Sequence, residues 1–139
     1  MAKLSAFGTK LTKGTYGSDV EVAQVTTLSG PSLALDTVDV TEHDGTGWEE
    51  VVATILRSGT VTFTIVYDPN EATHKNAVGG LLYDFSHRLS SVWNIVFPTA
   101  PVSHISFTGF VTGFTPSAPV DGALTASVTI KPTGIVTLP

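Results

Sequence analysis

Residues 60–67 (TVTFTIVY) alternate between large apolar side chains and small, mostly hydroxyl-bearing ones. Successive side chains of a strand point to opposite faces, so this pattern predicts a strand with one apolar and one uncharged face. The apolar positions are Val61, Phe63, Ile65 and Tyr67, and the opposite positions are Thr60, Thr62, Thr64 and Val66. Such a strand must bury its apolar face against another layer, which constrains the chain to a layered β fold.

Several other segments have the residue types that favour strands. They are rich in Val, Ile, Thr and aromatic side chains and are separated by Gly and Pro turn signals. They lie at 21–28, 33–40, 91–97, 104–114 and 123–130, with a short strand also possible at 8–11. We therefore predict a mainly β chain, an antiparallel β-sandwich or barrel.

Residues 69–89 have helical periodicity instead. Asp68 can cap a helix, Pro69 suits its first position, and Glu71 lies where a capping box places its carboxylate. Apolar residues then recur at helical spacing, at Val78, Leu81, Leu82, Phe85 and Leu89. We predict one flanking helix over 69–89, with Val78, Leu81, Leu82 and Phe85 in the core and with Gly79-Gly80 at a close approach or a kink.

The 139 residues are expected to form one domain, 1–139, with few charges. Charged residues make up 14% of the chain, well below the usual quarter. A free monomer normally uses charge to stay soluble, so neighbouring molecules are expected to cover much of this surface. A secreted or adhesive β-domain has a similar composition and remains an alternative. The net charge of −5 argues against a general nucleic-acid binder, which needs a basic face.

Residues 41–58 form a long polar segment between two predicted strands, too long and irregular for a tight hairpin. Residues 36–50 hold half of the acidic side chains, and no Lys or Arg occurs between Lys13 and Arg57. We interpret this segment as an arm that contacts a neighbouring subunit, anchored by an aromatic side chain. Its expected contact residues are Glu42, His43, Asp44, Trp48, Glu49, Glu50 and Arg57.

The two ends of the chain are also predicted to be arms. Residues 1–19 contain Lys3, Lys10 and Lys13, which are candidate partners for the acidic arm, together with Arg57 or Arg88. A disordered terminus is the alternative. Residues 131–139 carry two prolines and a glycine and are expected to finish as an extended C-terminal arm.

No sequence motif supports catalysis. His43, Asp44, Glu49 and Glu50 could ligate a metal, but they lack the spacing of established metal sites. No nucleophile elbow, phosphate loop or dinucleotide fingerprint occurs. His74 and His87 are expected on the surface. We predict a protein that is not an enzyme and that needs no cofactor and no metal.

The uncharged strand faces point to another role. The side chains opposite the apolar positions are Thr60, Thr62, Thr64, Thr125, Ser127 and Thr129. A sheet face in contact with solvent normally carries Lys and Glu. A neutral hydroxyl surface would suit a channel through which a polyanion slides, because each Lys or Arg there would bind phosphate. The alternative is that Thr simply favours strands.

The segment LDTVDVTEHDGTGWEEVVATILRSGTVTFTIVYDPNE, the helix after it, SVWNIVFP and the final strands resemble the tail tube (major tail) proteins of long-tailed bacteriophages and gene transfer agents. In that family a strand ending in D-x-x-D-V-T leads into a polar loop, a G-x-V-x-F strand and a helix opened by Y-D-P. Here these features lie at 36–41, 43–45, 59–63 and 67–69. The resemblance covers roughly residues 20–132.

This resemblance implies the tail-tube fold, six-subunit rings stacked into a hollow tube, and double-stranded DNA passing through the lumen. It implies partners such as the tape measure, tail terminator and distal tail proteins, and a location in the virion tail after assembly in the host cytoplasm. It favours a flexible tube without a sheath. A type VI secretion-like tube protein is a close alternative. A carbohydrate- or receptor-binding β-sandwich that uses Trp48, with or without Trp93, is a second.

Overall fold

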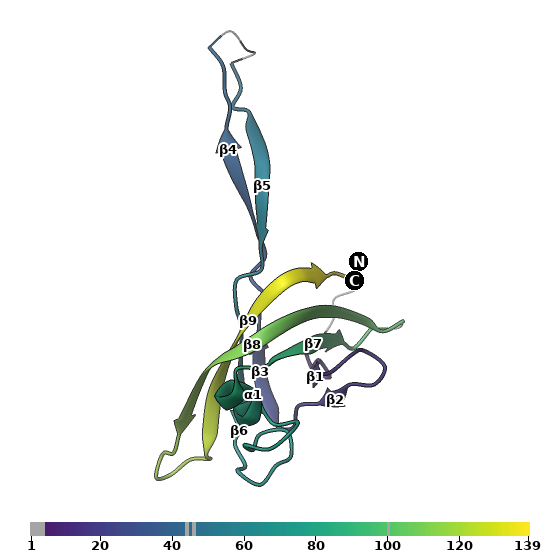
Figure 1. Ribbon diagram of the computed structural model, residues 1–139, viewed down its shortest axis with the longest axis vertical. Helices are drawn as coiled ribbons and strands as arrows, with labels where there is room; N and C mark the ends of the chain where they lie inside the picture. The colour runs from purple at the N-terminus through teal and green to yellow at the C-terminus, as the bar shows by residue number, and fades with distance from the viewer. Residues whose placement is uncertain (1–4, 44, 46, 100) are drawn as a thin grey trace.

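The computed structural model describes residues 5–43, 45, 47–99 and 101–139. Seven strands form one antiparallel sheet in the order β2-β1-β7-β8-β9-β6-β3, which curls into a half-barrel (Figure 1). The strands are β1 Lys10–Lys13, β2 Val20–Glu21, β3 Val25–Ser29, β6 Val61–Val66, β7 Ser90–Phe97, β8 Ser103–Ser117 and β9 Thr125–Thr137. The predicted class, a mainly β antiparallel fold with one helix, is confirmed.

The core lies on one face of this sheet, as the alternating pattern of residues 60–67 predicts. Val61, Phe63 and Ile65 on β6 are all buried. The register places Phe63 opposite Val128 of β9, so the apolar faces of the two strands are continuous. The indole of Trp93 is also buried, and its Nε1–H donates to the Gly109 carbonyl at 3.2 Å.

Two further strands form an arm that projects from the half-barrel (Figure 1). β4 Ala34–Asp39 and β5 Val51–Arg57 pair as an antiparallel hairpin. The expectation of an irregular segment over 41–58 is therefore wrong for its second half. The sequence VVATILR has apolar side chains on both faces, so it lacks the alternation that identifies a half-buried strand.

The single helix of the described residues is much shorter than predicted. α1 spans Leu81–His87, and residues 69–80 form turns. Asp68 does not cap this helix, whose N-cap is Gly80; its Oδ1 accepts from the Asn70 amide at 2.9 Å within a turn. The φ angle of Gly79 is +95°, which an α-helix cannot contain, so the helix begins only after Gly80. The apolar spacing that predicted a longer helix crosses this break.

The shorter helix changes which apolar residues reach the core. Leu81 is fully buried, and Leu82 is half-buried. Val78 lies outside the helix and is 83% exposed, while Phe85 is 44% exposed, so their assignment to the core is wrong. Among the residues that the structure describes, no helix combines the length and apolar character needed to cross a membrane.

Parts of both predicted terminal arms belong to the sheet. Lys10 and Lys13 lie in β1, which pairs with β7. At the other end, β9 continues to Thr137 and pairs with β8 at residues 131–133 and again at Thr137, so the prediction of a free C-terminal arm is wrong there. Pro132 pairs with Gly109 of β8 and is followed at once by a register shift between Thr133 and Thr137 of β9. Proline is tolerated in a sheet at such irregular positions. Lys3 lies outside the described residues.

Candidate assembly surfaces

The face of the sheet opposite the core carries a continuous band of hydroxyl side chains, here called the hydroxyl face. Side chains of directly paired residues share a face, and the register aligns Thr27 with Thr64, Thr64 with Ser127, and Ser127 with Thr115. The hydroxyl face comprises Thr27, Ser29, Thr62, Thr64, Thr115, Ser117, Thr125, Ser127 and Thr129. It therefore spans the four neighbouring strands β3, β6, β9 and β8 without an ionisable group.

The predicted lumen residues lie on or beside this face. Thr62 and Ser127 are exposed, and Thr64, Thr125 and Thr129 are partly exposed. Thr60 is exposed just before β6 begins. The first charge beyond the band on β9 is Lys131, whose ammonium donates to the Gly59 carbonyl at 2.9 Å.

The arm exposes apolar side chains on both of its faces. Leu35 pairs with Leu56, and Val38 pairs with Val52. Side chains alternate along β4, so these two pairs lie on opposite faces of the hairpin. All four side chains are more than half exposed. An isolated two-stranded hairpin is marginally stable in water, and the rest of the subunit leaves these side chains on both faces of the arm exposed.

A small network closes the base of the arm's tip. One carboxylate oxygen of Asp39 accepts from the Thr41 hydroxyl at 2.6 Å and from the Thr41 amide at 2.9 Å. These bonds lower the pKa of Asp39, the hydroxyl bond contributing most. The hydroxyl oxygen of Thr41 in turn accepts from the Glu50 amide at 2.9 Å, so a hydrogen bond connects the two sides of the tip.

The tip itself combines acidic side chains with an exposed aromatic. Glu42, Glu49 and Glu50 are exposed, and the indole of Trp48 is 80% exposed. Within the described residues, none of these three carboxylates lies within ion-pair distance of a Lys, Arg or His side chain. Asp44, also predicted here, lies outside the described residues.

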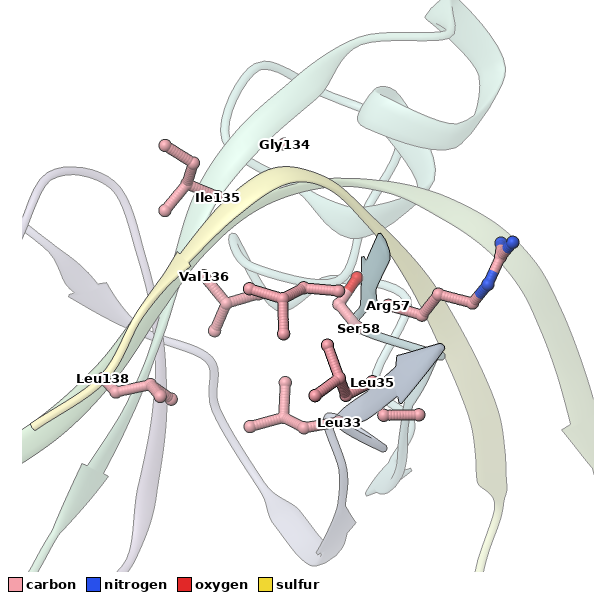
Figure 2. Close-up of a pocket in the computed structure, with 10 residues that line it drawn as sticks. Leu33, Leu35, Arg57, Ser58, Gly134, Ile135, Val136 and Leu138 are labelled. Carbon is pink, nitrogen blue, oxygen red and sulfur yellow. The ribbon is translucent and has the colours of Figure 1, made fainter. Parts of the chain in front are cut away.

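An apolar groove lies where the arm joins the half-barrel (Figure 2). Its volume is about 510 Å³, and it is lined by Leu33, Ala34, Leu35, Leu56, Arg57, Ser58, Gly134, Ile135, Val136 and Leu138. Val136 and Leu138 lie on the side of β9 that faces Leu33 and Leu35 (Figure 2). The sequence reasoning missed this root groove, because three distant segments form it and none of them has a distinctive pattern.

The predicted basic partners of the acidic arm are mostly engaged elsewhere. Lys13 pairs with Asp84 of α1 at 2.6 Å in a largely buried position. Lys10 lies 4.0 Å from Glu21, and Arg57 binds Asp36 within the arm at 2.7 Å. The structure therefore does not place Lys10 or Lys13 near the arm's own acidic tip, which lies at the far end of the hairpin (Figure 1).

Other candidate residues have structural positions. His74 is fully buried, contrary to expectation, and bridges the Ala23 carbonyl at 2.7 Å and the Asp68 amide at 3.4 Å. His87 is exposed, as expected. Trp93 is buried and cannot share a sugar-binding platform with Trp48. Across the described part of the chain, no three His, Asp or Glu side chains gather in a potential metal site.

The fold of this chain is similar to that of several solved structures. No protein-family model and no curated protein matches the sequence. Solved structures do match. The tail of a gene transfer agent (GTA) particle, computed with C6 symmetry, aligns at a TM-score of 0.72 and 14% identity, covering 94% of this chain and 95% of that one. The SPP1 tail tube aligns at 0.67 and 11% identity, covering 94% and 77%.

This chain has the tail tube fold. The same fold extends to contractile systems, because the sheath/tube terminator structure of the extracellular contractile injection system PVC aligns at a TM-score of 0.71. That match has 14% identity and covers 99% of this chain and 98% of the other. The tail tube fold predicted from the sequence is thereby confirmed.

Proposed function

We propose that this chain is the repeating subunit of a hollow tail tube. Six copies form a ring, the rings stack into a tube, and the tube conducts double-stranded DNA from a phage or phage-like particle into a host cell. The sixfold ring is proposed by analogy with the gene transfer agent tail, which was computed with C6 symmetry. In this role the chain is a structural protein and not an enzyme.

The hydroxyl face is the observation that carries the proposal. It covers four strands on the side opposite the core. A lysine or arginine there would bind DNA phosphates and release counterions, which would hold the DNA in place. Hydroxyl groups stay hydrated without an ionic attraction to phosphate. A ring that turns this face inward therefore encloses a channel in which DNA moves freely.

The arm supports stacking of the rings. Its two faces expose Leu35, Leu56, Val38 and Val52, and its tip exposes Trp48. This apolar surface is costly in water and becomes covered when the arm lies against neighbouring subunits. The proposed contact residues of the tip are therefore Glu42, His43, Asp44, Trp48, Glu49 and Glu50.

The other assignments follow from the same proposal. The subunit belongs to the virion tail, assembles in the host cytoplasm and does not insert into a membrane. Its partners are other copies of itself and the tape measure, tail terminator and distal tail proteins. Structures that contain similar chains include a tube terminator, a baseplate and a tube-terminating cap. DNA contacts the lumen without sequence specificity.

Negative-stain electron microscopy of the purified chain tests the proposal. We expect rings, or tubes of uniform diameter whose end views have six subunits around a central hole. A protein that stays monomeric at high concentration, in sedimentation as well as in micrographs, would contradict the proposal. Glycan binding by such a monomer would instead favour the carbohydrate-binding alternative.

A tube of a contractile injection system is the second candidate. The match to the PVC sheath/tube terminator structure, which covers 99% of this chain, favours it. Particles purified from the native source separate the two candidates. Nuclease-protected DNA in particles with bare tails supports the DNA-conducting tube, whereas a sheath around the tube and no packaged DNA supports the injection system.

A further inference from the structure

We propose that the acidic arm tip of one copy inserts Trp48 into the root groove of a second copy. This proposal rests on the proposed function and names the partner of the arm. It assigns the groove, which has no role in the single subunit, as the receptor for the tip. The contact joins two different surfaces, so it repeats from copy to copy; it closes into a ring where the rotation between copies closes and propagates along a stack where it does not.

The two surfaces match in apolar character. Trp48 is 80% exposed at the tip, and the groove presents Leu33, Leu35, Leu56 and Leu138 to solvent, each at least half exposed. A volume of about 510 Å³ lies within the range of pockets that enclose a small ligand, so the groove can hold an indole ring. Aromatic side chains buried in such pockets dominate many interfaces.

The charges of the two surfaces are also complementary. The tip surrounds Trp48 with Glu42, Glu49 and Glu50, whereas the residues that line the groove include Arg57 and no carboxylate. Arg57 also forms an ion pair with Asp36, with its Nε 2.7 Å from the Asp36 carboxylate. A second cation, Lys131, donates to the Gly59 carbonyl next to the groove residue Ser58. In the described part of the chain, no carboxylate lies within ion-pair distance of Lys131.

The partner must be another molecule. The tip lies at the end of the β4–β5 hairpin that is remote from the half-barrel (Figure 1), whereas residues 33–35 and 56–58, at the root of the hairpin, line the groove. The paired strands β4 and β5 separate them, and this pairing prevents the tip from folding back onto its own root. Phe7, near the N-terminus, is an alternative aromatic occupant of the groove because its side chain is also exposed. It has no acidic residue beside it in the sequence, so it lacks the negative charge that would complement the cations at the groove.

Disulfide trapping tests this contact directly, because the natural chain contains no cysteine. Glu49→Cys places a thiol at the tip and Ser58→Cys places one in the groove. Mixing the two variants under mild oxidation should give at least ten times more cross-linked dimer than mixing Glu49→Cys with Ser86→Cys, an exposed control position on α1. Equal yields would overturn the proposal, as would preferential cross-linking of Phe7→Cys to Ser58→Cys.

A charge exchange provides a second readout. Lys131→Glu should lower tube formation at least tenfold, and Glu49→Lys in the same chain should restore it. Failure of this restoration, with both variants folded by circular dichroism, would contradict the contact. The two proposals fail separately. Rings or tubes from the wild type, without tip-to-groove cross-links between the cysteine variants, would overturn only the contact. A wild-type chain that stays monomeric would overturn the proposed function.

Discussion

Leu81 is the residue through which the short helix joins the core. It is fully buried, whereas Val78, three residues earlier in the same apolar spacing, is 83% exposed. Leu81→Ala should lower the free energy of unfolding by about 2–5 kcal/mol, because it leaves a cavity in a packed core. Chemical denaturation measures the loss.

Val78→Ala is the matched control for this prediction. It removes a side chain from solvent and should change the free energy of unfolding by no more than about 0.5 kcal/mol. A loss of less than about 1 kcal/mol for Leu81→Ala would show that the helix does not depend on this contact.

Asp39 makes the order of the arm tip depend on pH. Hydrogen bonds from Thr41 lower the pKa of Asp39, so the folded-state value lies below the unfolded one. The stabilisation is therefore present above the unfolded pKa and is lost as the pH falls through the folded value, below about pH 4. The protection factor of the Glu50 amide, which donates to the Thr41 hydroxyl oxygen, should therefore fall in that window, as measured by hydrogen exchange corrected for the intrinsic rate at each pH.

Asp39→Asn is the control, since an amide does not titrate. In that variant the exchange of the Glu50 amide, corrected for intrinsic rates, should be independent of pH in the same window. An unchanged pH dependence would mean that another group controls the tip.

At the scale of elements, the sequence predicts a strand well where burial is one-sided. The alternation at 60–67 identified β6 because Val61, Phe63 and Ile65 pack in the core while Thr62 and Thr64 do not. The sequence did not predict β5, because both of its faces are exposed in the subunit and its residues do not alternate between apolar and polar. The predicted helix was too long because residue spacing does not reveal the positive φ of Gly79.

The arm is the element whose role a deletion isolates. Removing residues 43–48 shortens the tip and leaves the β4–β5 pairing intact. We expect a folded subunit or ring that does not stack, because in the proposed tube the tip makes the contact with the next subunit. Circular dichroism reports the fold, and sedimentation with electron microscopy reports assembly. Normal tubes from this deletion variant would leave the tip as an ordinary surface loop.

Substitutions separate the roles of the side chains at the tip. Trp48→Ala should weaken polymerisation more than any single acidic substitution, because the indole is the proposed apolar anchor. Phe7→Ala is the matched control, as it removes an aromatic side chain that is 91% exposed and lies outside the arm. An equal effect of the two substitutions on polymerisation would contradict a special role for Trp48.

For the whole molecule, the proposed lumenal position of the hydroxyl face predicts how a charge placed on it affects the passage of DNA. Introducing one cation per subunit with Ser127→Lys repeats the charge around every ring. We expect slower or arrested DNA passage, measured as a loss of DNA delivery by particles built from the variant, because the lysines bind phosphate. Ser86→Lys on α1 adds the same charge off the hydroxyl face and should leave delivery unchanged. Equal delivery by both variants would contradict a lumenal position for Ser127.

The sequence could not predict the root groove, because residues 33–35, 56–58 and 134–138 meet only in three dimensions. Nor could it predict the buried position of His74. The imidazole ring is hydrogen-bonded to the backbone of Asp68, which is near in sequence, and of Ala23, which is distant and meets the ring only in the folded chain. The neutral faces of β6 and β9 were visible from the spacing of Thr and Ser alone. Their union into one band needed the register of four strands.

A helical reconstruction of the assembled tube by cryo-electron microscopy tests the central claim most directly. We predict six subunits per ring, with the side chains of Thr62, Thr64, Ser127 and Thr129 pointing into an open channel. A tube whose channel is lined by another surface, with the hydroxyl face on the outside or buried between subunits, would contradict it.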